Sequence, residues 1–122
     1  MKITPTKIKD LVILEPQVFG DHRGYFMEAF KKEWFNEQFP ELEFVQDNES
    51  QSQKGVLRGL HFQTPPYAQT KLVRVIQGEV LDVAVDLRKD SPTHGQHVSI
   101  ILSDENKKQF LVPRGFAHGY VV

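Results

Sequence analysis

Hydrophobic and polar residues alternate along the second half of the chain, where from Glu43 onward the pattern predicts one strand after another. Residues 81–87 carry apolar side chains at the odd positions and aspartates or alanine between them, the period of two that indicates a strand with one apolar face. Residues 71–76 alternate in the same way, and Gln77-Gly78 is expected to turn the chain between these strands. A further strand is predicted over residues 98–102.

The first third of the chain combines short strands with a helix. Residues 11–14 and 18–19 are apolar and predict strands, and residues 20–24 predict a glycine-bounded turn. Lys31–Phe39 has aromatic residues near helical spacing and is followed by Pro40, which predicts a helix that ends there. Many short strands with one short helix near residues 31–39 predict an all-β sandwich or barrel rather than alternating α/β units.

Bulk composition narrows the function classes. A chain of 122 residues is long enough for one domain, 1–122. With 15 basic and 16 acidic residues it has no basic excess, so no nucleic-acid partner is expected. It has no cysteine, which excludes disulfides and thiolate metal sites. No apolar run has the length of a membrane span or a leader, so no membrane partner is expected and the predicted location is the cytoplasm.

The chain ends on a stretch, His118–Val122, that is predicted to begin a strand. A β-barrel that stopped there would leave an edge unpaired and its core open. Partner strands from a second subunit would solve this, but we favour the interpretation that the sequence lacks the C-terminal part of the domain.

His61 is the leading candidate for chemistry, because Arg58, Gln63 and Lys71 are close to it in the predicted sheet. A lone histidine is more often a hydrogen-bonded core residue, but neutral imidazole also accepts protons directly near pH 7. Arg58 and His61 have opposite parity on a regular strand. Both can therefore face one pocket only if Gly59 lies in a β-bulge.

Lys71 and His118 are the next candidates. Lys71 is either a solvated lysine at a strand end or, inside a barrel, an ammonium that stabilises an enolate oxygen. His118 follows the Pro113-Arg-Gly turn and is expected to contact a substrate if it is not structural. With Gln63 and Lys71 at the other positions, only His61 could join His118 as a ligand, and two histidines make a poor zinc or iron site. We therefore predict no metal and no cofactor.

Two further groups of polar residues are weaker signals. Asp82 and Asp86 lie on the polar side of their strand, where solvated or hydrogen-bonded structural carboxylates are expected; if that side lines the barrel, Asp82 would orient His61 or Lys71. Arg23 has the geometry to bind a phosphate with two hydrogen bonds, although a surface turn is the simpler interpretation.

The spacing of these residues resembles that of a cupin barrel, with the metal ligands replaced by Gln63 and Lys71. More specifically, the whole chain is similar to the dTDP-4-dehydrorhamnose 3,5-epimerase family. The resemblance depends on several blocks: Phe19–Phe26 with Glu28, Gln46–Asn48 with Ser50, Gly55–Gln63, Lys71–Val75, Gly78–Arg88 and Val112–Gly119.

The resemblance implies a metal-free, cupin-like jelly roll that forms a homodimer. It also implies epimerisation of dTDP-4-dehydro-6-deoxy-D-glucose at C3 and C5, on the route to dTDP-L-rhamnose. The residue matching His61 removes the two protons, and the residue matching Lys71 stabilises the C4 enolate. Contacts with the nucleotide or sugar are implied for Arg23, Phe26, Glu28, Gln46, Asn48, Arg58 and His118.

The family's general acid, a tyrosine, and an aspartate that pairs with the base both come later than Val122, and Tyr120 is too early to be that tyrosine. Three alternatives stay open. One is a related 3-epimerase or 3,4-ketoisomerase, and another is a nucleotide-sugar-binding cupin without turnover. The third, a metal-dependent cupin enzyme, is disfavoured by Gln63 and Lys71.

Overall fold

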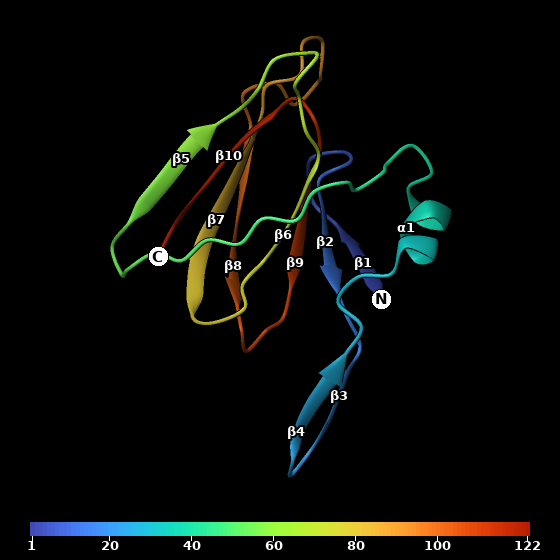
Figure 1. The fold of residues 1–122 in the computed structure, drawn as a ribbon. Coiled ribbons are helices and arrows are strands. Elements are labelled where there is room, and N and C mark those ends of the chain that lie inside the picture. Colours follow the sequence, from blue (N-terminus) through green and yellow to red (C-terminus); the bar gives the residue numbers. More distant parts are fainter. The chain divides into compact units, whose positions relative to one another are not determined.

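Ten short strands and one helix form the chain, and the computed structural model describes all of residues 1–122 (Figure 1). The chain divides into two compact units, of which the first comprises Met1–Glu15 with Ser52–Val122 and the second Pro16–Gln51. The elements of the first unit are β1 (Lys2–Pro5), β2 (Val12–Glu15), β5 (Leu57–His61), β6 (Lys71–Arg74), β7 (Glu79–Asp86), β8 (His97–Ser103), β9 (Gln109–Val112) and β10 (Phe116–Val121). Those of the second are β3 (Val18–Asp21), β4 (Gly24–Met27) and α1 (Lys32–Gln38).

The first unit is a sandwich of two antiparallel four-stranded sheets, β1-β2-β9-β6 and β5-β10-β7-β8. Its core contains Phe110 and Val112 from the first sheet and Ala84, Leu102 and Phe116 from the second. Because one cluster takes side chains from both sheets, the sheets pack face to face. This confirms the predicted all-β class, with one short helix.

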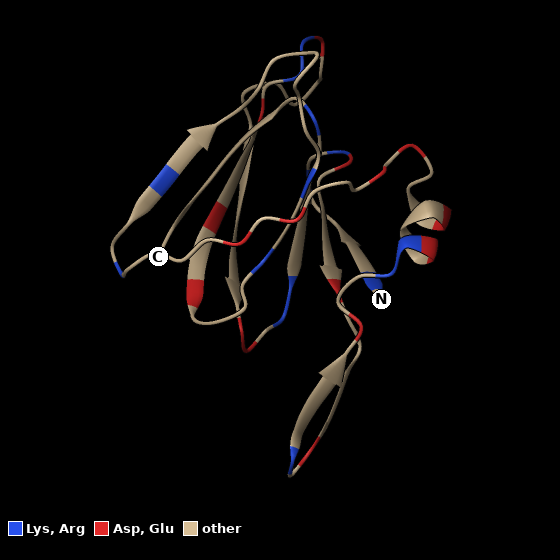
Figure 2. Ribbon diagram, viewed as in Figure 1, with Lys and Arg blue, Asp and Glu red and all other residues tan.

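Strand β7 buries the face that carries its aspartates, which is one of the two alternatives that the sequence left open. The aspartates Asp82 and Asp86 are fully buried on the same side as the core residue Ala84, whereas Leu81 on the opposite side is 39% exposed. Acidic positions therefore lie within this strand's inner face, although basic and acidic positions are otherwise interspersed along the ribbon (Figure 2). Alternation alone located the strand correctly but did not reveal which face is buried, because it does not show the polar partners that each carboxylate meets there.

The second unit combines the β3–β4 hairpin with α1. Phe35 of the helix is 2% exposed and packs among other aromatic rings, with its centroid 4.8 Å from that of Phe30 and 5.0 Å from that of Trp34. Phe39 and Phe44 complete this aromatic cluster. The cluster explains why the aromatic spacing predicted the helix to within one residue at each end.

Three other expectations differ from the structure. Strand β1 was not predicted, because its lysine, threonine and proline obscure the apolar pattern. Residues 43–56 contain no strand, although strands were expected from Glu43 onward. The last strand, β10, begins at Phe116 rather than at His118, and it lies between β5 and β7, while β5 and β8 are the edges of its sheet (Figure 1). As a separate finding, no helix of the chain is both long enough and apolar enough to cross a membrane.

Candidate active site

Two histidines stand side by side on the inner face of the β5-β10-β7-β8 sheet. Strand β10 pairs with β5 on one side and with β7 on the other. Its His118 lies directly opposite His61 of β5 and opposite Ala84 of β7. Directly opposed residues of antiparallel strands project to the same face. Since Ala84 belongs to the core, both histidines project toward the space between the sheets. His118 is buried there, while His61 stays exposed to solvent.

Arg58 joins this face through a β-bulge. Between the pairs His118–His61 and Tyr120–Arg58 the register shifts, so two steps along β10 correspond to three along β5. The extra residue reverses the parity of β5, and Arg58 and His61 come to the same side. The sequence-based requirement for a bulge at Gly59 is thus confirmed.

Two glycines allow the close approach of strands at the bulge. A Cβ on Gly59, which has a φ of +116°, would lie 2.7 Å from the Cα of Gly119. A Cβ on Gly119 would lie 2.6 Å from the carbonyl oxygen of Arg58. Both contacts are with backbone atoms, so neither position accepts a larger residue without moving a strand. The Gly59–Gly119 contact therefore sets the geometry between His61 and His118.

Lys71 reaches the same space from the other sheet. It begins β6 and lies opposite Val112 of β9, a core residue, so its side chain projects inward. A cavity of about 410 Å³ is lined by both His61 and Lys71. Its other lining residues are Phe62, Gln63, Gln69, Gly115 and Phe116. A proton acceptor and an ammonium group thus meet at one cavity from two different sheets.

Asp82 belongs to this site, but it pairs with a different residue from the two expected. His118 Nε2 lies 2.7 Å from Asp82 Oδ1, whereas we had expected the carboxylate to orient His61 or Lys71. An ionised carboxylate only accepts hydrogen bonds, so His118 donates its Nε2–H and its Nδ1 is left for other contacts. Burial raises the pKa of Asp82, and the hydrogen bond to His118 with the charges of His118 and Lys71 partly offsets that rise.

The remaining predicted binding residues lie in the second unit, on exposed positions. Arg23, in the turn of the β3–β4 hairpin, donates from Nη2 to Asp21 Oδ2 at 2.6 Å and from Nε to both carboxylate oxygens. Phe26 is 71% exposed on β4, and Glu28 follows that strand. Gln46 and Asn48 are joined by a hydrogen bond of 3.1 Å.

No group of three or more His, Asp or Glu side chains in the chain is arranged to hold a metal ion. Sequence reasoning did not name four residues of the cavity wall as site residues, namely Phe62, Gln69, Gly115 and Phe116. The Pro113-Arg-Gly turn, which was used to find His118, also points to Phe116, because that residue is the first of the strand that the turn begins. Nothing in the sequence singles out Gln69.

Comparisons with known proteins identify the family to which the chain belongs. A family model described as dTDP-4-dehydrorhamnose 3,5-epimerase matches residues 5–122. The chain is 58% identical over 123 aligned residues to the dTDP-4-dehydrorhamnose 3,5-epimerase of Shigella flexneri, covering 100% of this chain and 68% of that protein. In length, the chain thus spans about two thirds of this relative.

Solved structures show the same likeness. The dTDP-6-deoxy-D-glucose-3,5-epimerase of Legionella pneumophila, solved with dTDP-4-keto-L-rhamnose, is 55% identical with a TM-score of 0.94, over 99% of this chain and 64% of that one. A 3'-monoepimerase of Streptomyces bikiniensis in complex with dTDP-quinovose is 31% identical with a TM-score of 0.88, over 96% of this chain and 60% of that one. The chain therefore belongs to the dTDP-4-dehydrorhamnose 3,5-epimerase family of cupin-like isomerases.

Proposed function

We propose that this protein epimerises dTDP-4-dehydro-6-deoxy-D-glucose at C3 and C5, giving dTDP-4-dehydro-L-rhamnose. The observation that carries the proposal is the convergence of His61 and Lys71 on one interior cavity from two different sheets. The names of the Shigella and Legionella relatives, and the ligand of the latter, support the same substrate class.

The proposed chemistry follows from the position of the ketone. C3 and C5 both adjoin C4, so removing a proton from either carbon gives an enolate with its charge on the C4 oxygen. His61 accepts the proton, and the Lys71 ammonium stabilises the enolate. Removing one preorganised donor of this kind typically costs about 3–4 kcal/mol of barrier. Reprotonation on the other face completes each inversion, and we do not assign Tyr120 as the acid.

The binding residues are proposed from the resemblance of the sequence. Arg58 and His118 would contact the substrate from the inner face that carries His61, and Arg23, Phe26, Glu28, Gln46 and Asn48 would supply the other contacts. We further propose a cytoplasmic homodimer of metal-free, cofactor-free subunits, in each of which residues 1–122 belong to a single epimerase domain; these assignments also depend on the resemblance.

Proton NMR of the substrate incubated with the protein in D₂O tests the proposal. We expect deuterium at C3 and C5, and we expect His61→Ala to abolish both exchanges. His97→Ala is the matched control, because His97 is exposed at the start of β8 and does not line the cavity. Exchange at the normal rate in His61→Ala would remove His61 from the role of base.

Lys71→Ala separates the enolate role from binding. We expect kcat to fall by about a hundredfold or more while KM changes little, because the interaction is made chiefly in the transition state. Lys54→Ala, in an exposed turn, is the control. A change confined to KM would contradict the role.

Epimerisation at C3 alone is the second candidate. It is supported by the similarity to the Streptomyces 3'-monoepimerase. Deuterium at C3 without deuterium at C5 would select this candidate, and the same spectrum therefore decides between the two.

A further inference from the structure

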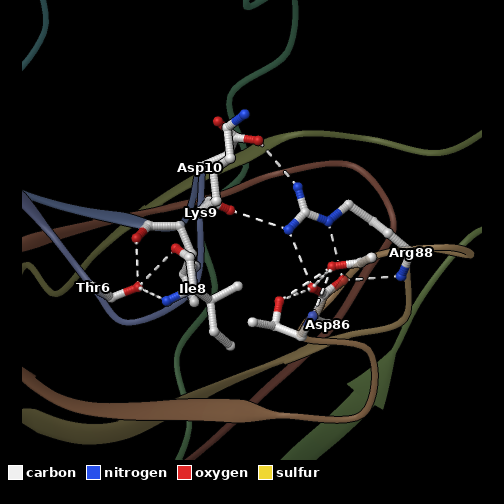
Figure 3. Close-up of polar contacts among 9 residues, drawn as sticks. Thr6, Ile8, Lys9, Asp10, Asp86 and Arg88 are labelled. Atoms are coloured by element: carbon white, nitrogen blue, oxygen red, sulfur yellow. Dashed lines mark hydrogen bonds and ion pairs between the residues drawn. The ribbon is translucent and has the colours of Figure 1, made fainter.

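A second buried aspartate, at the far end of β7 from Asp82, is enclosed by hydrogen-bond donors. Asp86 accepts from Arg88 Nε at 3.0 Å and Nη2 at 3.1 Å, and from the backbone N–H of Arg88 at 3.0 Å. The hydroxyls of Ser91 and Thr93 donate to Oδ2, the oxygen that also accepts from Arg88 Nη2, at 2.6 and 2.5 Å. The carboxylate is completely buried, and Figure 3 shows Arg88 directed at it.

The same guanidinium also holds a distant turn. Arg88 Nη1 donates to Asp10 Oδ2 and Nη2 donates to the carbonyl of Lys9, each at 3.1 Å (Figure 3). Thr6 closes that turn by donating to the carbonyl of Leu11 at 2.7 Å. We use the name Arg88 clasp for Asp10, Asp86, Arg88, Ser91 and Thr93.

The clasp lies directly against the cavity wall. The guanidinium carbon of Arg88 is 4.9 Å from the centre of the Phe116 ring, within cation–π range. A Cβ on Gly115, whose φ is +85°, would lie 2.7 Å from Arg88 Cγ, so only glycine permits this contact. The carbonyl of Gly115 accepts from the N–H of Leu87 at 3.0 Å. Gly115 and Phe116 both line the cavity that contains His61 and Lys71.

Phe116 also begins the strand that carries His118. It lies opposite Asp86 in the β10–β7 register and is 5% exposed. The Arg88 clasp therefore fixes one end of β10, and the Asp82–His118 pair fixes its middle. Because two carboxylates share the guanidinium charge, the clasp holds the aromatic wall without adding an unpaired positive charge to it.

We propose that Arg88 is a positioning residue of the active site, which holds Gly115 and Phe116 against the sugar so that its C3 and C5 protons meet His61. This role rests on the proposed function. The diphosphate contacts are assigned to other residues, so the clasp should affect turnover more than nucleotide binding. A displacement of about 1 Å at a reacting centre can cost about a hundredfold in rate.

The test compares Arg88→Met, which keeps the aliphatic part of the side chain and removes the guanidinium group, with Arg88→Lys, which keeps the positive charge. The control is Lys89→Met, at an exposed neighbouring position. In D₂O exchange assays on folded protein we expect kcat to fall about a hundredfold in Arg88→Met and about tenfold in Arg88→Lys, with KM within threefold of wild type. Lys89→Met should match wild type. Normal kcat in folded Arg88→Met overturns the proposal; if that variant does not fold, normal kcat in Arg88→Lys does so.

A second readout needs no turnover. The ring signals of Phe116 and the imidazole signals of His118 are compared by NMR in wild type, Arg88→Lys and Lys89→Met, without substrate. We expect both sets to shift in Arg88→Lys alone. Unshifted signals overturn the positioning role. If wild type shows no deuterium exchange, the proposed function fails, while these shifts still decide whether Arg88 positions the wall.

Discussion

Strand β7 buries two aspartates completely, Asp82 within the strand and Asp86 at its last position, yet the two carboxylates are held in opposite ways. Asp86 accepts hydrogen bonds from Arg88, Ser91 and Thr93, and these lower its pKa well below the usual range although burial opposes them. Asp82 is hydrogen-bonded to His118 through Oδ1, and its Oδ2 has no hydrogen-bond partner; burial raises its pKa. A buried carboxylate with every partner supplied is a structural device, whereas an incompletely paired one is typical of a functional site.

Replacing the aspartates one at a time gives the largest expected contrast. Asp86→Asn should lower the free energy of unfolding by about 3–5 kcal/mol at pH 7, because it leaves Arg88 without its buried counter-charge. Asp82→Asn should lower it by less than about 1 kcal/mol, since the amide no longer carries a charge that burial opposes. Urea unfolding followed by circular dichroism measures both. Equal losses of unfolding free energy in the two variants would contradict the distinction between Asp82 and Asp86.

The Asp82→Asn substitution, which is expected to change stability little, should have a clear effect on activity. Asp82→Asn leaves His118 without a carboxylate acceptor, so we expect the imidazole to change tautomer or orientation and kcat to fall about tenfold to a hundredfold. The deuterium exchange assay measures this on protein whose unfolding curve is close to that of wild type. Retention of full kcat would show that the Asp82–His118 pair is structural.

Removing a single hydrogen-bond donor tests how much each partner of Asp86 contributes to stability. Ser91→Ala deletes one of the hydroxyls on Asp86 and should lower the free energy of unfolding by about 1.5–3 kcal/mol, the usual range for a hydrogen bond to a charged group. Ser99→Ala is the control, because Ser99 lies opposite Val83 on the outer face of the sheet. An unchanged midpoint for Ser91→Ala would mean that the remaining donors fully satisfy Asp86.

The pH dependence of stability should have opposite signs at the two aspartates. Asp86 has a folded-state pKa below its ordinary value of 3.8, so its contribution to stability is complete above that pH and is lost as the pH falls further. Asp82 has a folded-state pKa above 3.8, so its contribution to stability is present below that pH and is lost as the pH rises from there through the folded-state pKa. Urea unfolding of wild type and both asparagine variants from pH 2 to pH 7 checks this. Parallel curves for all three proteins would contradict both pKa directions.

Local patterns predicted the local elements. The helix was found because its aromatic spacing is contained within nine residues, and the turn at Gln77-Gly78 was found because glycine marks it. The bulge at Gly59 was predicted from a parity conflict between Arg58 and His61, a purely one-dimensional argument.

Long-range pairing was beyond the same patterns. The alternation in β7 gave no sign that His118 would meet Asp82, or that the hydroxyls of Ser91 and Thr93 would meet Asp86. His118 lies 36 residues after Asp82, and only the sheet register brings the two together. Ser91 and Thr93 lie five and seven residues after Asp86, in the loop that follows the strand, where a strand pattern gives no information. For the same reason Asp82 was assigned to His61 or Lys71, the candidates that were already under consideration.

The bulge in β5 shifts the alternation of side chains along this strand by one residue. Side chains before Gly59 therefore project to the face opposite to the one that an unbroken alternation would give, while the orientation of His61 and the residues after it is unchanged. A single-residue deletion at this point would therefore turn Arg58 to the opposite face of the sheet and leave His61 in place. One change of length, with no change in the chemical groups themselves, would thus separate Arg58 from the proposed proton acceptor.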